Sequence, residues 1–217
     1  MSPETSETRY GTLVMRAILA CIVLLLLASG AIVARVLTRA ASPDPPVDPQ
    51  EFAIAQARSD LAQDPESPKL HTDLGLALYR VGREQEAADE FSAALGLDAG
   101  YGPAAAHLAT ALWFSGNRDG AVSVLTDYLT ENPGDTELRF QLATYQQESG
   151  ETSAAAGSLR LVLDRTPADA AARYRLGACL EALGERGPAV VQYREALRYS
   201  PGYAPAIDAL RRMGETP

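Results

Sequence analysis

The chain has 217 residues, of which 47% are hydrophobic and 22% charged, which is enough for one domain with a core and an additional segment. Its net charge is −9: residues 51–135 hold 14 acidic and five basic side chains, and residues 136–217 hold ten of each. This balance excludes a nucleic-acid partner, because phosphate binding needs clustered positive charge. The asymmetry reflects either solvated helix faces or two ends that prefer oppositely charged partners.

An apolar segment follows the short N-terminal tail. The 18 residues from 17 to 34 contain no charged side chain and lie between Arg16 and Arg35. As a helix they span about 27 Å, close to the hydrocarbon thickness of a bilayer. We therefore expect one transmembrane signal-anchor helix at residues 17–37. A signal peptide cleaved near Ala28 is the alternative.

The segments on either side of this helix are polar. Residues 1–16 form a short tail that we expect to be disordered. Residues 38–50 contain prolines at positions 43, 45, 46 and 49, so they cannot be helical and predict a semi-rigid polyproline II linker. Arginines are equally frequent before and after the apolar segment, so charge alone leaves the orientation open. The short tail favours an extracytoplasmic position for the bulk of the chain, held to what we expect to be a bacterial cytoplasmic membrane.

From residue 51 the sequence repeats itself with a period of 34 residues. Glycines recur at the same spacing at positions 82, 116, 150 and 184, and prolines occupy positions 65, 133, 167 and 201, with Ala99 at the one remaining position. Such a period indicates stacked helix–turn–helix units, with the glycines at helix C-termini. The most regular feature is a ladder of small side chains: Ala53, Ala87, Ala121, Ala155 and Ala189.

The helical spacing of the apolar residues divides this region into units. We expect four complete units, at 68–101, 102–135, 136–169 and 170–203. Residues 51–65 are interpreted as the second helix of an incomplete unit, and residues 204–214 as an additional first helix. A helix with a polar outer face at each end caps a solenoid and keeps it soluble. Residues 51–214 are therefore predicted to form an all-α solenoid.

This pattern resembles the tetratricopeptide repeat family. The resemblance rests on the alanine ladder and on four dipeptides in the first helices: Leu74-Gly75, Leu108-Ala109, Leu142-Ala143 and Leu176-Gly177. It implies a right-handed superhelical α-solenoid whose first helices line a concave surface that binds a peptide or helix of a partner. The sequence departs from the family where a bulky aromatic residue is expected in each first helix: His71, Ala105, Arg139 and Arg173 stand there.

Projecting the family's concave positions onto this chain gives a candidate binding groove. Trp113 is expected to face this groove, and for Phe114 and Phe140 packing between the helices is the alternative. The lysines and asparagines with which some members hold an acidic chain terminus are missing, so we expect a partner with an apolar or aromatic segment. The candidate groove residues are Lys69, Thr72, Leu76, Tyr79, Arg80, His107, Thr110, Trp113, Phe114, Phe140, Gln141, Tyr174 and Arg175.

No motif in the sequence carries catalysis. The two histidines, His71 and His107, lack the spacing of a zinc site, and no phosphate-binding or nucleophile motif occurs. We expect His71 to pack between helices and Cys179 to be a buried apolar side chain. No enzyme activity, cofactor or metal is expected.

The predicted function is that of a membrane-anchored scaffold or adaptor for other proteins. Its expected partners are a protein or peptide in the groove and the membrane through the N-terminal helix. Two alternatives stay open: an accessory factor of c-type cytochrome maturation that holds apocytochrome, which is an analogy of architecture, and a structural subunit that self-associates.

Overall fold

The computed structural model describes residues 48–217, in which ten helices and no strand occur. The predicted tail at residues 1–16, the anchor at 17–37 and the linker up to residue 47 lie outside the described residues. Residues 49 and 50 of the predicted linker are helical, which corrects the expectation that none of residues 38–50 is helical: Pro49 is the first residue of the helix Pro49–Gln63, where a proline is tolerated. Within the described part, no helix combines the length and apolar character needed to cross a bilayer.

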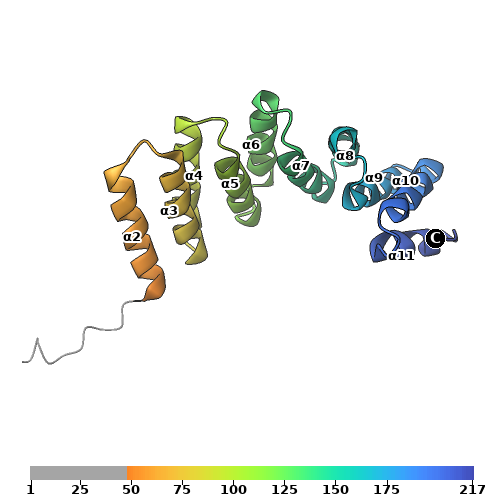
Figure 1. Cartoon of the computed structure of the whole chain (residues 1–217), viewed down its shortest axis with the longest axis horizontal. Helices are drawn as coiled ribbons and strands as arrows, with labels where there is room; N and C mark the ends of the chain where they lie inside the picture. Colours follow the sequence, from red (N-terminus) through yellow and green to blue (C-terminus); the bar gives the residue numbers. More distant parts are fainter. Residues whose placement is uncertain (1–47) are drawn as a thin grey trace, which may run out of the picture. The chain divides into compact units, whose positions relative to one another are not determined.

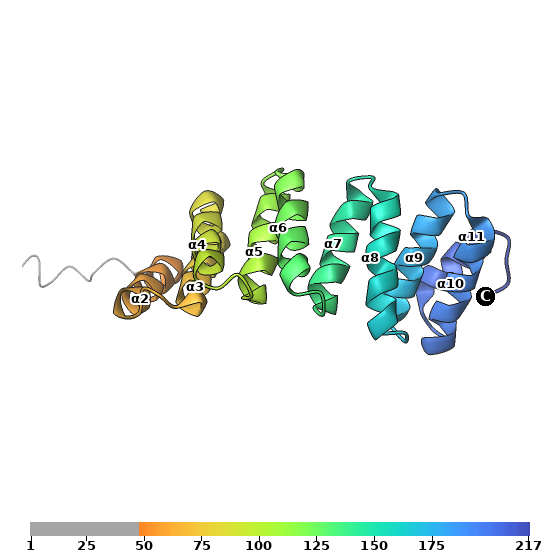
Figure 2. The same cartoon turned by 90° about the horizontal axis from the view of Figure 1, so that it is seen from above.

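The helices follow one another in a row of antiparallel pairs (Figures 1 and 2). Each predicted unit contains two helices, and the partial units at both ends contain one each. In chain order they are α2 (Pro49–Gln63), α3 (Pro68–Arg80), α4 (Glu84–Leu97), α5 (Gly102–Phe114), α6 (Arg118–Glu131), α7 (Thr136–Glu148), α8 (Thr152–Arg165), α9 (Ala170–Ala182), α10 (Arg186–Tyr199) and α11 (Ala204–Arg212).

The helix ends follow from local sequence signals. The carboxylate of Asp135 accepts a hydrogen bond from the backbone N–H of Leu138 at 3.0 Å, and Asp169 caps α9 in the same way. Each first helix of a complete unit ends at a glycine with a positive φ, between 77° and 91°, which other residues rarely adopt. The predicted role of these four glycines is confirmed.

The alanine ladder lies in the contact between the two helices of each unit. Ala87, Ala121, Ala155 and Ala189 are fully buried, as the small side chain lets the helices approach closely. Ala53 is exposed, because its unit has no first helix among the described residues to cover it.

Each unit also packs against its neighbours, so the core is continuous along the row. Leu95, Leu112 and Val124 pack against the buried clusters of both the first and the second unit. At the two ends, α2 contributes the buried Ile54 and α11 contributes the buried Leu210. The helices of residues 49–212 thus form an all-α solenoid within one compact unit of the described structure.

Candidate functional site

The thirteen candidate groove residues all lie on the first helices of the four complete units, α3, α5, α7 and α9. These helices contact one another along the row, as α3 does with α5 and α5 with α7. We call the face that they form the first-helix surface. The candidate residues differ strongly in how far they are exposed on it.

Trp113 is buried, which corrects its expected place in an open groove. Only 8% of the residue is exposed, because the ring of Tyr145 from α7 stacks on the indole with 4.2 Å between ring centres and 3° between planes. The guanidinium of Arg118 lies over the same indole at 5.1 Å. The only tryptophan is therefore part of the core that joins the second and third units.

Thr72 is likewise buried, at 3% exposure, and does not contribute a free side chain to the groove. Its hydroxyl donates to the backbone carbonyl of Pro68, one helical turn earlier, at 2.9 Å. Thr110 makes the same bond to Ala106 at 2.8 Å but stays partly exposed. This bond satisfies the hydroxyl within the helix, which is how a threonine is accommodated against the core.

Gln141 joins two units on the first-helix surface. Its side-chain amide donates to the hydroxyl of Thr110 and to the hydroxyl of Tyr145, both at 3.0 Å, and lies 3.4 Å from the carbonyl of Ala106. The Tyr145 hydroxyl also donates to Thr110 at 3.4 Å. Because this network connects α5 with α7, it fixes the spacing of the second and third units.

Arg175 forms the corresponding junction between the third and fourth units, with Gln147 and Phe140 of the third unit. The guanidinium of Arg175 donates to the side chain of Gln147 at 3.1 Å and lies 5.4 Å from the ring centre of Phe140. Tyr174 packs within the fourth unit, against the rings of Tyr193 and Tyr203. Phe140 and Tyr174 are both partly buried.

The freely exposed part of the candidate set lies on α3 and α5. Phe114 is 69% exposed at the C-terminal end of α5, more than any other large hydrophobic residue of the described chain. Lys69 and Arg80 are exposed, and Lys69 pairs with Asp73 one turn away. Leu76 and Tyr79 are partly buried against the first cluster.

The titratable side chains near this surface have a structural role. His107 is partly buried against the ring of Phe91, at 5.5 Å between ring centres, and burial lowers the pKa of its imidazole. Cys179 is fully buried, and burial raises the pKa of its thiol, which disfavours the reactive thiolate. Residues 48–217 hold no group of three or more histidine, cysteine, aspartate or glutamate side chains placed to bind a metal.

Three family models, each described as tetratricopeptide repeat, match this sequence. They cover residues 52–102, 78–142 and 115–199, and so together span most of the described helices. The chain belongs to the tetratricopeptide repeat family. Among curated proteins, none matches the sequence.

Several solved structures share the fold. A crystal structure of MamA matches with a TM-score of 0.63 and 21% identity, over 71% of this chain and 91% of that one. YrrB, described as a TPR protein with an unusual peptide-binding site, matches with a TM-score of 0.63 and 24% identity, over 75% and 84%. MamA from Desulfovibrio magneticus matches with a TM-score of 0.60 and 17% identity, over 80% and 93%.

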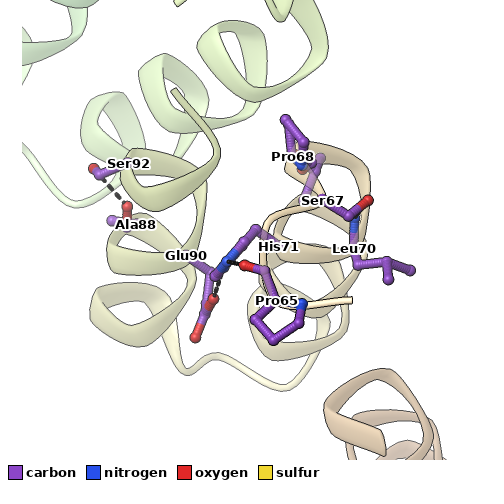
Figure 3. A network of polar contacts seen from close by, with 9 residues as sticks. Pro65, Ser67, Pro68, Leu70, His71, Ala88, Glu90 and Ser92 are labelled. Carbon is purple, nitrogen blue, oxygen red and sulfur yellow. Dashed lines mark hydrogen bonds and ion pairs between the residues drawn. The ribbon is translucent and has the colours of Figure 1, made fainter. Parts of the chain in front are cut away.

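The polar residues that replace the family's aromatic form a recurring contact in this tetratricopeptide chain. The two ring nitrogens of His71 lie 2.7 Å from a carboxylate oxygen of Glu90 and 3.1 Å from the carbonyl oxygen of Pro65 (Figure 3). Arg173 donates to Pro167 at 2.8 Å and to Gln192 at 3.1 Å, at the same sequence separations. His71 thus packs between α3 and α4, as expected.

In the third unit Arg139 makes only the contact to the preceding loop, in which it donates to the carbonyl of Pro133 at 3.1 Å. The second unit has Ala105 at this position and Val124 opposite it, so neither contact can form. Each of these polar side chains binds the loop before its unit, which compensates for the missing aromatic ring. The second unit is the exception.

Two residues that cover Trp113 were missed in the sequence, one on α7 and one at the start of α6. Tyr145 covers Trp113, and Arg118 lies over it, but neither stands at a concave position of the repeat. A signal for Tyr145 exists: the equivalent positions of the other units hold Ala77, Ala111 and Cys179, so only the third unit has a large side chain there. Arg118 carries no such signal.

Proposed function

We propose that this chain is a membrane-anchored tetratricopeptide scaffold whose first-helix surface binds an apolar or aromatic segment of a partner protein. The observation that carries the proposal is Phe114, a large apolar side chain that is 69% exposed at the end of α5, one repeat after the exposed Arg80 at the end of α3. Exposed aromatic side chains on an otherwise polar surface are the residues that dominate binding energy at interfaces.

Two further points support this proposal. YrrB, which shares the fold, is described as having a peptide-binding site. The first-helix surface is also held rigid by the Gln141 and Arg175 contacts between units, so little conformational entropy is lost when a peptide binds. The anchor at residues 17–37 would attach the chain to the membrane, with the repeats on the extracytoplasmic side.

Site-specific photo-crosslinking of the full-length protein in its native membranes tests the proposal. A photoreactive residue in place of Arg80 is expected to capture a partner, whereas the same residue in place of Leu161, which is 50% exposed on α8, is the matched control. Phe114→Ala is expected to reduce the Arg80 adduct at least fivefold. Equal adducts at both positions, or an Arg80 adduct unaffected by Phe114→Ala, would contradict the proposed surface.

The orientation has its own test. A reporter enzyme that is active only outside the cytoplasm, fused after Pro217, is expected to be active. An inactive fusion together with an active cytoplasmic reporter at the same position would reverse the proposed topology and leave the binding surface unaffected. Self-association is distinguished by the mass of the captured partner, because a second copy of the chain gives an adduct of twice the chain mass.

A further inference from the structure

A hollow of about 450 Å³ lies on the second helices, outside the first-helix surface. It is formed by the C-terminal halves of α4 and α6, two consecutive second helices in the row (Figure 1). Leu95, Val124 and Tyr128 give it apolar walls, and Ala99 lies in the loop that closes it. None of the candidate groove residues lines it.

The hollow occurs where the repeat departs from its own pattern. The loop position held by Pro65, Pro133 or Pro167 at the other junctions is Ala99 here, so no pyrrolidine ring fills the space. The polar side chain that binds this loop in the other units is absent, because Ala105 replaces it. Val124 replaces its polar partner, which leaves an apolar wall. These departures all fall at the junction of the first and second units.

Two carboxylates stand at the rim of the hollow without a cationic partner. Asp127 and Glu131 both line it, and neither takes part in any ion pair within residues 48–217. Asp127 accepts one hydrogen bond, from the exposed Ser123 at 3.3 Å. Glu131 is also in the last turn of α6, where the negative end of the helix dipole adds to the field.

The surrounding charge has the same sign. Residues 51–135, which contain the hollow, hold 14 acidic and only five basic side chains, so the local field attracts cations. An arginine or lysine side chain has an aliphatic stem that packs on apolar walls and a charged end that stays at the rim. Its two parts match the walls and the rim of this hollow.

We propose that the hollow between α4 and α6 is a second docking site, which takes an arginine or lysine beside an apolar residue in a segment of a partner protein. At 450 Å³ it lies toward the lower end of the range of ligand pockets, about 300–1,000 Å³, and so accommodates one or two side chains. The site is independent of the first-helix surface, so one can fail while the other holds.

Titration of the full-length protein, labelled at its leucine and valine methyl groups, tests this site by NMR. The probe is the dipeptide acetyl-leucyl-arginine amide, and the uncharged isostere acetyl-leucyl-citrulline amide is its matched control. The arginine probe is expected to shift the Leu95 and Val124 methyl signals saturably, with an affinity in the millimolar range. The citrulline probe is expected to bind at least fivefold more weakly.

Variants of the rim separate this site from general electrostatic attraction. Asp127→Asn and Glu131→Gln are each expected to weaken binding of the arginine probe at least threefold. Asp119→Asn, at the other end of α6, removes the same charge away from the hollow and is expected to leave the affinity unchanged. All three side chains are exposed, so the fold should persist.

Three outcomes would overturn the proposal. The first is equal binding of the two probes. The second is equal weakening by Asp119→Asn and Asp127→Asn. The third is a shift confined to the Leu76 methyl signals on α3, which would place the probe on the first-helix surface.

Discussion

At the scale of single residues, the two neighbouring aromatic side chains at the end of α5 have opposite roles. Trp113 is held between Tyr145 and Arg118 and is nearly inaccessible, whereas Phe114, the next residue, is 69% exposed. Consecutive residues of a helix point about 100° apart, so one can face the next unit while the other faces water. Binding and stability are therefore separable by mutation at this point.

Trp113→Ala is expected to lower the free energy of unfolding by about 3–5 kcal/mol, because it leaves a cavity and removes the ring stacked on Tyr145. Phe114→Ala is expected to change it by no more than about 0.5 kcal/mol. Chemical denaturation followed by circular dichroism measures both. A Trp113→Ala variant as stable as the original chain would show that the indole is not a core residue.

The pair of Tyr193 and Glu181 predicts a loss of stability in alkali. Burial and the hydrogen bond to Glu181, at 2.8 Å, raise the pKa of the Tyr193 hydroxyl. The unfolded chain ionises this group near pH 10, whereas the folded chain keeps it neutral to higher pH. Its stabilising contribution is therefore complete below about pH 10 and is lost as the pH rises further.

Denaturant titrations at pH 8 and pH 11 are expected to show this loss, and Tyr193→Phe is expected to reduce it. An unchanged difference between the two pH values in Tyr193→Phe would assign the alkaline loss to other groups, such as Tyr128 and Tyr203, whose pKa values burial also raises.

At the scale of elements, each helix pair is held by a compensating pair of side chains. A small residue on the first helix faces a large one on the second: Gly75 faces Phe91, and Gly177 faces Tyr193. In the second and third units Ala109 and Ala143 stand at this position, and leucines replace the ring. The volume at the crossing is conserved, and this conserves the geometry of the pair.

Gly75→Ala tests this packing, because a Cβ atom there would lie 2.5 Å from the ring of Phe91. We expect it to lower the free energy of unfolding by about 1–3 kcal/mol through overpacking. The control is Gly157→Ala in α8, where no atom lies within 4 Å of the added Cβ and helix propensity should stabilise by about 0.5–1 kcal/mol. Thermal melts of both variants measure this, and equal shifts would contradict a close crossing at Gly75.

The backbone of the loop between α4 and α5 is compatible with a proline at position 99, where this chain has an alanine. The residue before Ala99 has an extended backbone, with φ −143° and ψ 99°, close to the −138° and 86° of Ser200 before Pro201. Among the hydrogen bonds of residues 48–217, the amide of Ala99 donates none. Ala99→Pro is therefore expected to stabilise the protein by about 0.4–1 kcal/mol, measured by denaturation, because it restricts the unfolded chain. A destabilised variant would mean that this loop needs another φ.

At the scale of the whole described unit, the row of helices depends on contacts between neighbours. In such solenoids the total stability is approximately a sum over units and their interfaces, so an end unit protects the next one. Here α11 buries Ala206, Ala209 and Leu210 completely, and the guanidinium of Arg186 binds the carbonyl of Met213 behind it. The last helix is thus a structural cap, in which Arg211 is exposed and Arg212 pairs with Glu181 of α9 at 2.9 Å.

Removal of α11 by ending the chain after Tyr203 is expected to cost roughly 2–5 kcal/mol, because the apolar side of the fourth unit becomes exposed. Ending it after Gly214 removes only the tail, whose Glu215 pairs with exposed arginines, and should cost less than about 1 kcal/mol. Denaturation of the full-length and shortened chains measures the difference. Equal stability of the two shortened chains would exclude α11 as a cap.

The sequence by itself determined the repeat, the glycines that end the first helices, and the burial of the alanine ladder in the four complete units. These features depend on local and periodic signals, such as Gly82 at a helix end and Ala87 at a crossing, and each unit repeats them. Which first-helix residues stay free depended on the tertiary structure. Contacts between units bury Trp113 under Tyr145, occupy Gln141 with Thr110 and leave Phe114 exposed. The 34-residue period describes what units share, whereas exposure depends on the one neighbour that each side chain meets.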